Sequence, residues 1–243
     1  MSLSPFSLKF PASAVYGAGR APIVSFDESN VLAKWSCNEP YGDLIDSVGS
    51  HDGDDENSVL SAAGKLGTSR LFTRANSERF RVTPKPAFPA SQHANWSVSA
   101  WIYPVQNVTA GIIGVWESPN SWLFYFSGGS SSPILKCIIN DGVNPSHLAA
   151  SADNLINLNA WNHIVVCSSG DDDVVQLWHD GVKVKETAWA NGVDVSNTAP
   201  VMIGCWDSVL LLNHFDGRLD QIRLHTEAVT PTQIATLYAE NVS

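Results

Sequence analysis

The fold is decided by the stretch Trp161-Asn162-His163-Ile164-Val165-Val166-Cys167, which is followed by Gln176-Leu177-Trp178-His179-Asp180-Gly181-Val182-Lys183-Val184. Both runs are rich in β-branched and aromatic residues, as strands are. Asp180-Gly181 lies between apolar residues, at a position where a tight hairpin needs positive φ angles. The stretch therefore predicts antiparallel strands joined as a hairpin.

A third run, Phe215-Asp216-Gly217-Arg218-Leu219-Asp220-Gln221-Ile222-Arg223-Leu224, predicts a further strand. After it, Thr230 can cap a helix, Pro231 suits the first helical position and Gln233 can complete a capping box. Ile234, Leu237 and Tyr238 would then share one face of the helix. The chain is therefore expected to end in one short helix.

Short strand patterns separated by turn residues continue upstream of this stretch. Residues 96–103 alternate apolar and polar side chains, and similar apolar runs occur at 112–116, 122–126 and 135–139. Strands at this spacing with almost no helix indicate an all-β, antiparallel β-sandwich. A length of 243 residues fits one large sandwich.

These motifs resemble the laminin G-like, concanavalin A-like jelly-roll family. Its members carry a Trp-x-His strand, a strand ending in Asp-Gly, a Phe-x-Gly-x-Ile-Asp-x-Ile-Arg strand and a Leu-(Ser/Thr)-x-x-(Glu/Gln)-Ile-x-x-Leu-Tyr segment. This chain matches all four, with Leu219 in the Ile place and Val229-Thr230 in the Leu-Ser place. The resemblance implies a jelly-roll domain over residues 31–243.

Residues 1–30 have no counterpart in that family. Phe6, Leu8 and Phe10 alternate as in a strand, and Pro11 and Gly17 then interrupt regular structure. An N-terminal arm that attaches the domain to an assembly and a plain edge strand of the sandwich are both open interpretations.

The formal net charge of −10 disfavours nucleic acid and anionic membranes as partners, because both are negatively charged. No apolar run reaches the roughly 20 residues of a membrane span. The N-terminus lacks the basic and apolar regions of a secretory signal, which predicts synthesis in the cytosol without a signal peptide. The four cysteines show no Cys-x-x-Cys pair and are expected to be reduced core residues rather than disulfides.

Calcium is the cofactor that the resemblance implies, and Asp46 and Asp220 occupy motif positions near calcium in relatives. Glu39 or Asp43 could add a third carboxylate, since calcium prefers oxygen ligands. The alternative is that Asp46 and Asp220 accept backbone N–H bonds in turns.

Aromatic side chains outside the expected core are candidates for sugar binding, because pyranose rings stack on them. The alternatives for each Trp are burial in the core or a place in a protein interface. The candidates are four Trp residues with four polar neighbours: Trp116, Trp122, Trp189, Trp206, Asn120, Asp207, Asn213 and His214.

No paired carboxylates of the glucanase pattern Glu-x-Asp-x-x-Glu occur, and Asp171-Asp172-Asp173 is expected to be the solvated tip of a hairpin. The sequence therefore predicts a non-enzymatic module that decorates a larger assembly, such as a bacteriophage virion, or binds cell-surface glycans. Its expected partners are other protein subunits, as a homo-oligomer or on a particle. The alternative is a carbohydrate-active enzyme or its accessory calcium-dependent lectin domain.

Overall fold

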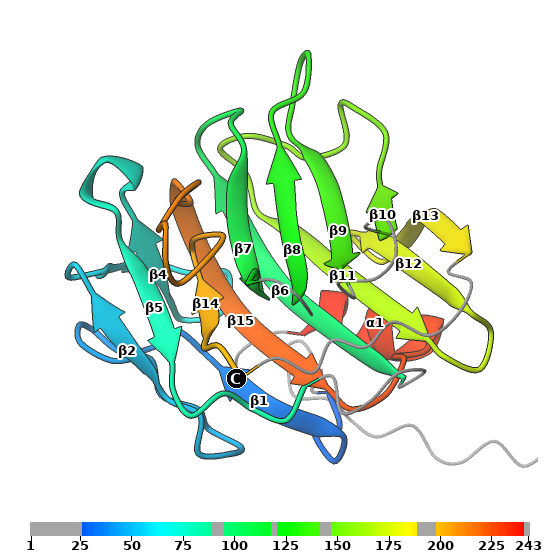
Figure 1. Ribbon diagram of the computed structural model, residues 1–243, viewed down its shortest axis with the longest axis horizontal. Coiled ribbons are helices and arrows are strands. Elements are labelled where there is room, and N and C mark those ends of the chain that lie inside the picture. Colours follow the sequence, from blue (N-terminus) through cyan, green and yellow to red (C-terminus); the bar gives the residue numbers. More distant parts are fainter. Residues whose placement is uncertain (1–25, 89–94, 118–120, 141–146, 189–197, 241–243) are drawn as a thin grey trace, which may run out of the picture.

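The computed structural model describes residues 26–88, 95–117, 121–140, 147–188 and 198–240. Its strands form two antiparallel sheets whose inner faces share one hydrophobic core (Figure 1). The helix α1 (Pro231–Ala239) and the single 3-10 turn η1 (Arg74–Asn76) complete the secondary structure of these residues. The all-β, antiparallel jelly-roll sandwich with one short C-terminal helix is confirmed.

Sheet A has the strand order β13-β12-β11-β6-β15-β4-β3, and β1 also pairs with β15. The central strand β15 therefore joins the beginning of the described chain to its end. The strands of sheet A are β1 (Val31–Trp35), β3 (Leu60–Ala63), β4 (Thr68–Phe72), β6 (Trp96–Pro104), β11 (Asn162–Ser169), β12 (Val174–His179), β13 (Val182–Ala188) and β15 (Gly217–His225).

Sheet B has the strand order β10-β9-β8-β7-β14-β5-β2 and faces sheet A across the core. Its strands are β2 (Gly53–Glu56), β5 (Arg79–Val82), β7 (Ala110–Val115), β8 (Ser121–Ser127), β9 (Ile134–Asn140), β10 (His147–Ala150) and β14 (Val201–Ile203).

The hairpin that decides the fold forms as the sequence predicts. Asp180 and Gly181 adopt φ angles of 47° and 78° between β12 and β13, which matches the right-handed twist of the flanking strands. The C-terminal helix also starts as expected. The Thr230 side chain accepts from the Gln233 N–H, and the Gln233 side chain accepts from the Thr230 N–H, so both halves of the capping box are present.

Strands β2, β3 and β10 were not predicted, and β2 shows why. Its sequence Gly53-Asp54-Asp55-Glu56 contains no good strand former. It pairs with β5 because Glu56 forms ion pairs with the Arg79 and Arg81 side chains, with N–O distances of 2.6 and 2.7 Å. A cross-strand charge contact replaces the missing hydrophobic pattern.

Alternating residues of β11 separate the two faces of sheet A. Ile164 and Val166 point into the core between the sheets, whereas Val165 and Cys167 belong to a second apolar cluster with Ile234 and Leu237 of α1. The helix therefore covers the outer face of sheet A (Figure 1). All four cysteines are buried and free, as expected for small core residues.

Residues before β1 already belong to the folded domain. Phe26 is buried, its N–H donates to Oε1 of Glu240 at 3.1 Å, and its ring lies edge-on to His225 with 5.4 Å between ring centroids. The last residues of the expected arm thus pack against the domain from Phe26 onward, and residues 1–25 lie outside the described residues. Across the described parts of the chain, no helix has the length and apolar content to cross a bilayer.

Candidate ligand-binding sites

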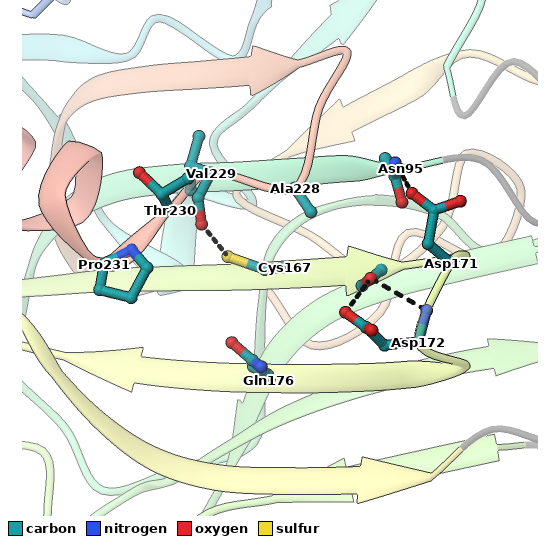
Figure 2. A pocket seen from close by; sticks show the side chains of 10 residues that line it. Asn95, Cys167, Asp171, Asp172, Gln176, Ala228, Val229, Thr230 and Pro231 are labelled. Atoms are coloured by element: carbon teal, nitrogen blue, oxygen red, sulfur yellow. Dashed lines mark hydrogen bonds between the residues drawn. The ribbon is translucent and has the colours of Figure 1, made fainter.

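A pocket of about 450 Å³ opens on the outer face of sheet A, between the start of α1 and the β11–β12 turn (Figure 2). Cys167 of β11 and Gln176 of β12 lie at its floor. The segment Ala228–Pro231, which leads into α1, forms one wall. The turn after β11 and Asn95 before β6 form the opposite wall, so three separate segments of the chain meet around one hollow: Asn95, the β11–β12 hairpin and Ala228–Pro231.

The polar wall of the pocket is held in place by its own hydrogen bonds. Asn95 Nδ2 donates to Asp171 Oδ2 at 3.0 Å, and Gly170 N–H donates to Asn95 Oδ1 at 2.9 Å. Ser169 Oγ donates to Asp172 Oδ2 at 2.8 Å. Oδ1 of each aspartate accepts no hydrogen bond from the residues that the structure describes, so two carboxylate oxygens are free to accept from a ligand.

The lining of the pocket is acidic and polar. Of the lining residues that the structure describes, none is Lys, Arg or His. Burial raises the pKa of the Cys167 thiol to about 12, so this sulfur stays protonated and is no nucleophile at neutral pH. The pocket thus suits a ligand rich in hydroxyl or ammonium donors and disfavours an anion.

The sequence placed Asp171, Asp172 and Asp173 at a solvated hairpin tip. All three are exposed, which confirms that interpretation. The sequence did not indicate that Asp171 and Asp172 also line a pocket. The missing information is that Asn95 and Ala228–Pro231, both distant in sequence, pack beside this turn.

A second candidate surface is the aromatic cluster formed by Trp116, Tyr125 and Trp206 at the outer face of sheet B. Trp206 lies edge-on to Tyr125 and Trp116, with ring centroids 5.3 and 6.4 Å apart. Trp116 and Trp206 are half-buried, whereas Tyr125 is nearly covered. Two of the predicted stacking residues therefore meet, and Tyr125, which was not predicted, joins them.

The prediction for Trp122 is wrong, because its side chain is completely buried in the core. Its ring lies 5.2 Å from that of Phe88 and 6.2 Å from that of Trp96, centroid to centroid. A residue in this position cannot offer a ring face to a sugar. The predicted residues Trp189 and Asn120 lie outside the described residues.

The polar partners predicted near Trp206 serve mainly to build the loop that follows it. Asp207 is buried, and its Oδ1 accepts the N–H groups of Val209, Leu210 and Leu211. Asn213 accepts the Gly111 N–H at 2.9 Å through its backbone carbonyl. His214 is buried, which lowers the pKa of its imidazole, so this ring is neutral at physiological pH.

Asp46 is the organising residue of the loop between β1 and β2. Its Oδ1 accepts the N–H groups of Lys34, Val48 and Gly49 at 2.9, 3.0 and 3.0 Å. Its Oδ2 accepts the His51 N–H at 3.1 Å. Four backbone donors therefore converge on one carboxylate, which is the turn-forming alternative that the sequence left open.

Asp220 is completely buried on β15, beside a bulge in its pairing with β6. Its Oδ2 accepts the N–H groups of Lys65 and Leu66 at 2.8 and 2.9 Å. Its Oδ1 has no hydrogen-bond partner among the described residues. Burial raises the pKa of this carboxyl to about 6, because a charged carboxylate is poorly solvated there.

These arrangements do not fit a calcium site built on Asp46 and Asp220. Calcium takes six to eight oxygen ligands, whereas backbone N–H groups already point at both oxygens of Asp46 and at one of Asp220. Within the described ranges, no three His, Cys, Asp or Glu side chains gather closely enough to hold a metal ion. Calcium binding stays an untested prediction for this chain.

Comparison with known proteins gives the family. Residues 74–235 match the Laminin_G_3 family model, described as the concanavalin A-like lectin/glucanases superfamily. The match covers more than half of the chain, which therefore belongs to this superfamily. A search of curated proteins found no match.

Solved structures share the fold at low sequence identity. Domain 4 of AbnA, a GH43 extracellular arabinanase from Geobacillus stearothermophilus in complex with arabinotriose, superposes with a TM-score of 0.67 at 20% identity, covering 86% of this chain and 98% of that one. The binding domain of Paraclostridial Mosquitocidal Protein 1 superposes with a TM-score of 0.71 at 15% identity, covering 87% of this chain and 52% of that one. The botulinum neurotoxin serotype G binding domain superposes with a TM-score of 0.65 at 14% identity, covering 86% of this chain and 50% of that one. This chain spans about half of each toxin domain.

Proposed function

We propose that this chain is a non-catalytic glycan-binding module and that the pocket on sheet A holds one end of a neutral oligosaccharide. A volume of about 450 Å³ lies within the range of small-ligand sites. Membership of a lectin and glucanase superfamily supports a carbohydrate ligand. So does the arabinanase domain of the same fold, which was solved with arabinotriose.

One observation carries the proposal: Asp171 and Asp172 both line the pocket, and each uses only one carboxylate oxygen in hydrogen bonds with the described residues. Sugar hydroxyls are donors that such oxygens bind, and hydrogen bonds to charged acceptors are stronger than those to neutral ones. A glycan that carries uronic acids would meet two negative charges and no cation among the lining residues described. Neutral sugars are therefore the preferred ligands.

The position of the same carboxylates argues against hydrolysis. A glycosidase needs one carboxylic acid kept protonated by burial and a second carboxylate across the scissile bond. Asp171 and Asp172 are neighbours on one exposed turn and lie on the same side of the pocket. This geometry supports binding without catalysis.

The experiment is calorimetric titration of the full chain with arabinotriose, a set of other neutral oligosaccharides and a set of oligosaccharides that contain uronic acid. Binding of a neutral sugar should weaken about tenfold in Asp172→Asn, the loss of one charge-assisted hydrogen bond. Asp54→Asn removes an exposed carboxylate from sheet B and is the matched control, with unchanged affinity expected.

Three results would overturn this assignment. The first is equal binding by wild type and Asp172→Asn. The second is loss of binding in Trp116→Ala or Trp206→Ala alone, which would move the site to the aromatic cluster. The third is release of reducing ends, which would make the chain a carbohydrate-active enzyme. Sugar binding that a chelator abolishes would instead favour an accessory calcium-dependent lectin.

A second candidate function is a structural role in an assembly, specifically a bacteriophage virion, with residues 1–30 as the attachment arm. The observation that favours it is the anchoring of Phe26 beneath Glu240 and His225, because any segment before Phe26 starts from a fixed point on the domain. Deletion of residues 1–25 should abolish attachment to a particle and leave the thermal unfolding of the domain unchanged. Attachment by the shortened protein would overturn this candidate.

A further inference from the structure

The loop after β14 exposes consecutive aliphatic residues. Val209, Leu210 and Leu212 are 69%, 69% and 50% exposed, and together with Leu211 they form what we call the apolar loop, residues 209–212. Adjacent exposed aliphatic side chains on a folded domain commonly mark an interaction surface.

The apolar loop is built to be rigid. Oδ1 of the buried Asp207 accepts three successive backbone N–H groups from inside the loop. Trp206 N–H donates to the Leu212 carbonyl at 3.1 Å and closes the loop at its base. Leu211 adopts φ of 52°, a left-handed conformation that is strained for a residue with a side chain. Three backbone N–H groups and one carbonyl of the loop are thus bonded at its base, while Val209, Leu210 and Leu212 remain exposed.

The charge around the apolar loop is balanced, in contrast to the net charge of −10 of the chain. Arg81 donates to the Ser208 carbonyl at 3.3 Å and pairs with Glu56, which also pairs with Arg79. Arg79 is buried, so the loop is bordered by one partly exposed group of each sign, Arg81 and Glu56. Two copies of an acidic chain repel each other least where their charges cancel, and a patch with both signs can complement itself across a twofold axis.

We propose that the apolar loop is the surface through which a second copy of this chain binds. A preformed loop loses little conformational entropy on association, which favours binding through a small area. Such an interface is below standard size, so the dimer is weak and depends on protein concentration. The inference is independent of the glycan pocket, which lies on the other sheet.

Sedimentation velocity of the full chain over a wide range of concentrations tests the proposal. The wild type should shift from monomer to dimer as concentration rises. Leu210→Asp should remain monomeric. Val182→Asp is the matched control, because Val182 is 63% exposed on β13 and the substitution adds the same charge. Thermal unfolding of both variants establishes that they fold.

A covalent test uses Leu210→Cys, because the four native cysteines are buried. The introduced thiols of two copies, meeting across a twofold axis, should form a disulfide when an added oxidant takes up two electrons and two protons. Val182→Cys should not cross-link. The proposal is overturned if the wild type stays monomeric at every concentration or if Leu210→Asp dimerises like Val182→Asp. It is also overturned if the wild type is monomeric and sediments with phosphatidylcholine vesicles, and Leu210→Asp does not sediment with them.

Discussion

The carboxylates of this protein fall into two groups that the sequence does not distinguish. Asp46 in the loop after β1 accepts four backbone N–H groups, whereas Asp171 and Asp172 in the β11–β12 turn are exposed and each keep an oxygen free. The first kind of carboxylate builds a loop and has no capacity left for a ligand. The second is positioned by one bond and can bind with the other oxygen.

The largest effect is expected for Asp46→Ala. Four partly buried backbone donors would lose their shared acceptor, which should lower the free energy of unfolding by about 4 kcal/mol. Urea unfolding measures the loss. Asp54→Ala, in the neighbouring strand, should change stability by less than about 0.5 kcal/mol because its side chain is exposed. Similar values for both variants would remove the distinction between the two groups.

Asp207→Ala should have the next largest effect. The free energy of unfolding should fall by about 2 kcal/mol, because three N–H groups of the apolar loop lose their acceptor. The same variant should dimerise more weakly, since a mobile loop has more entropy to lose on association. Thermal unfolding and sedimentation measure the two effects. Lost stability with unchanged dimerisation would separate the loop's rigidity from its binding role.

Asp220→Asn tests a carboxylate that is buried but only half satisfied. The pKa of Asp220 is about 6 in the folded protein and about 4 when unfolded, so the fold loses stability as pH rises from about 4 to about 6 and regains it as pH falls through the same range. Between about pH 7.5 and about pH 5, wild type should gain about 1 kcal/mol relative to Asp220→Asn. His163 and His225, whose pKa values burial lowers to about 3, titrate alike in both proteins. Parallel pH profiles in urea unfolding would contradict the expectation.

The smallest effect on stability is expected for Asp172→Asn, within about 0.5 kcal/mol, although affinity for a neutral sugar should drop about tenfold. A melting curve and a sugar titration on the same sample measure both quantities. A large loss of stability would place Asp172 with Asp46 among the loop-building carboxylates.

The effect of calcium on stability also tests whether Asp46 only builds its loop. Since Asp46 is surrounded by N–H donors, the melting temperature should be the same in calcium and in a chelator. A calcium-dependent rise in melting temperature that Asp46→Ala or Asp220→Asn removes would show that these carboxylates bind a metal ion, contrary to this expectation.

Strands and the helix follow from local chemistry, and the sequence therefore predicts them well. The Asp180-Gly181 turn and the Thr230 capping box depend on residues close in sequence. Strand β2 escaped prediction because its pairing depends on Arg79 and Arg81, which lie on another strand.

The site was less predictable, for the same physical reason. Trp116 and Trp206 were selected as aromatic residues outside the expected core and do meet. Trp122, at the beginning of a strand, points to the core, because a shift of one residue along a strand exchanges its faces. The pocket depends on Asn95 and Ala228–Pro231 packing beside a turn, which no local pattern reveals.

The position of β15 at the centre of sheet A also affects how the protein is made. Trp35 of β1 pairs with Ile222, and β4 and β6 pair with the same strand, so three early strands wait for a partner near the end of the chain. Sandwiches dominated by such distant pairings fold slowly, and their unpaired edges are prone to aggregation in the meantime. Emergence of residues 217–225 from the ribosome therefore sets the earliest moment at which sheet A can close, and a chain stalled before that point keeps the edges of β1, β4 and β6 open to aggregation.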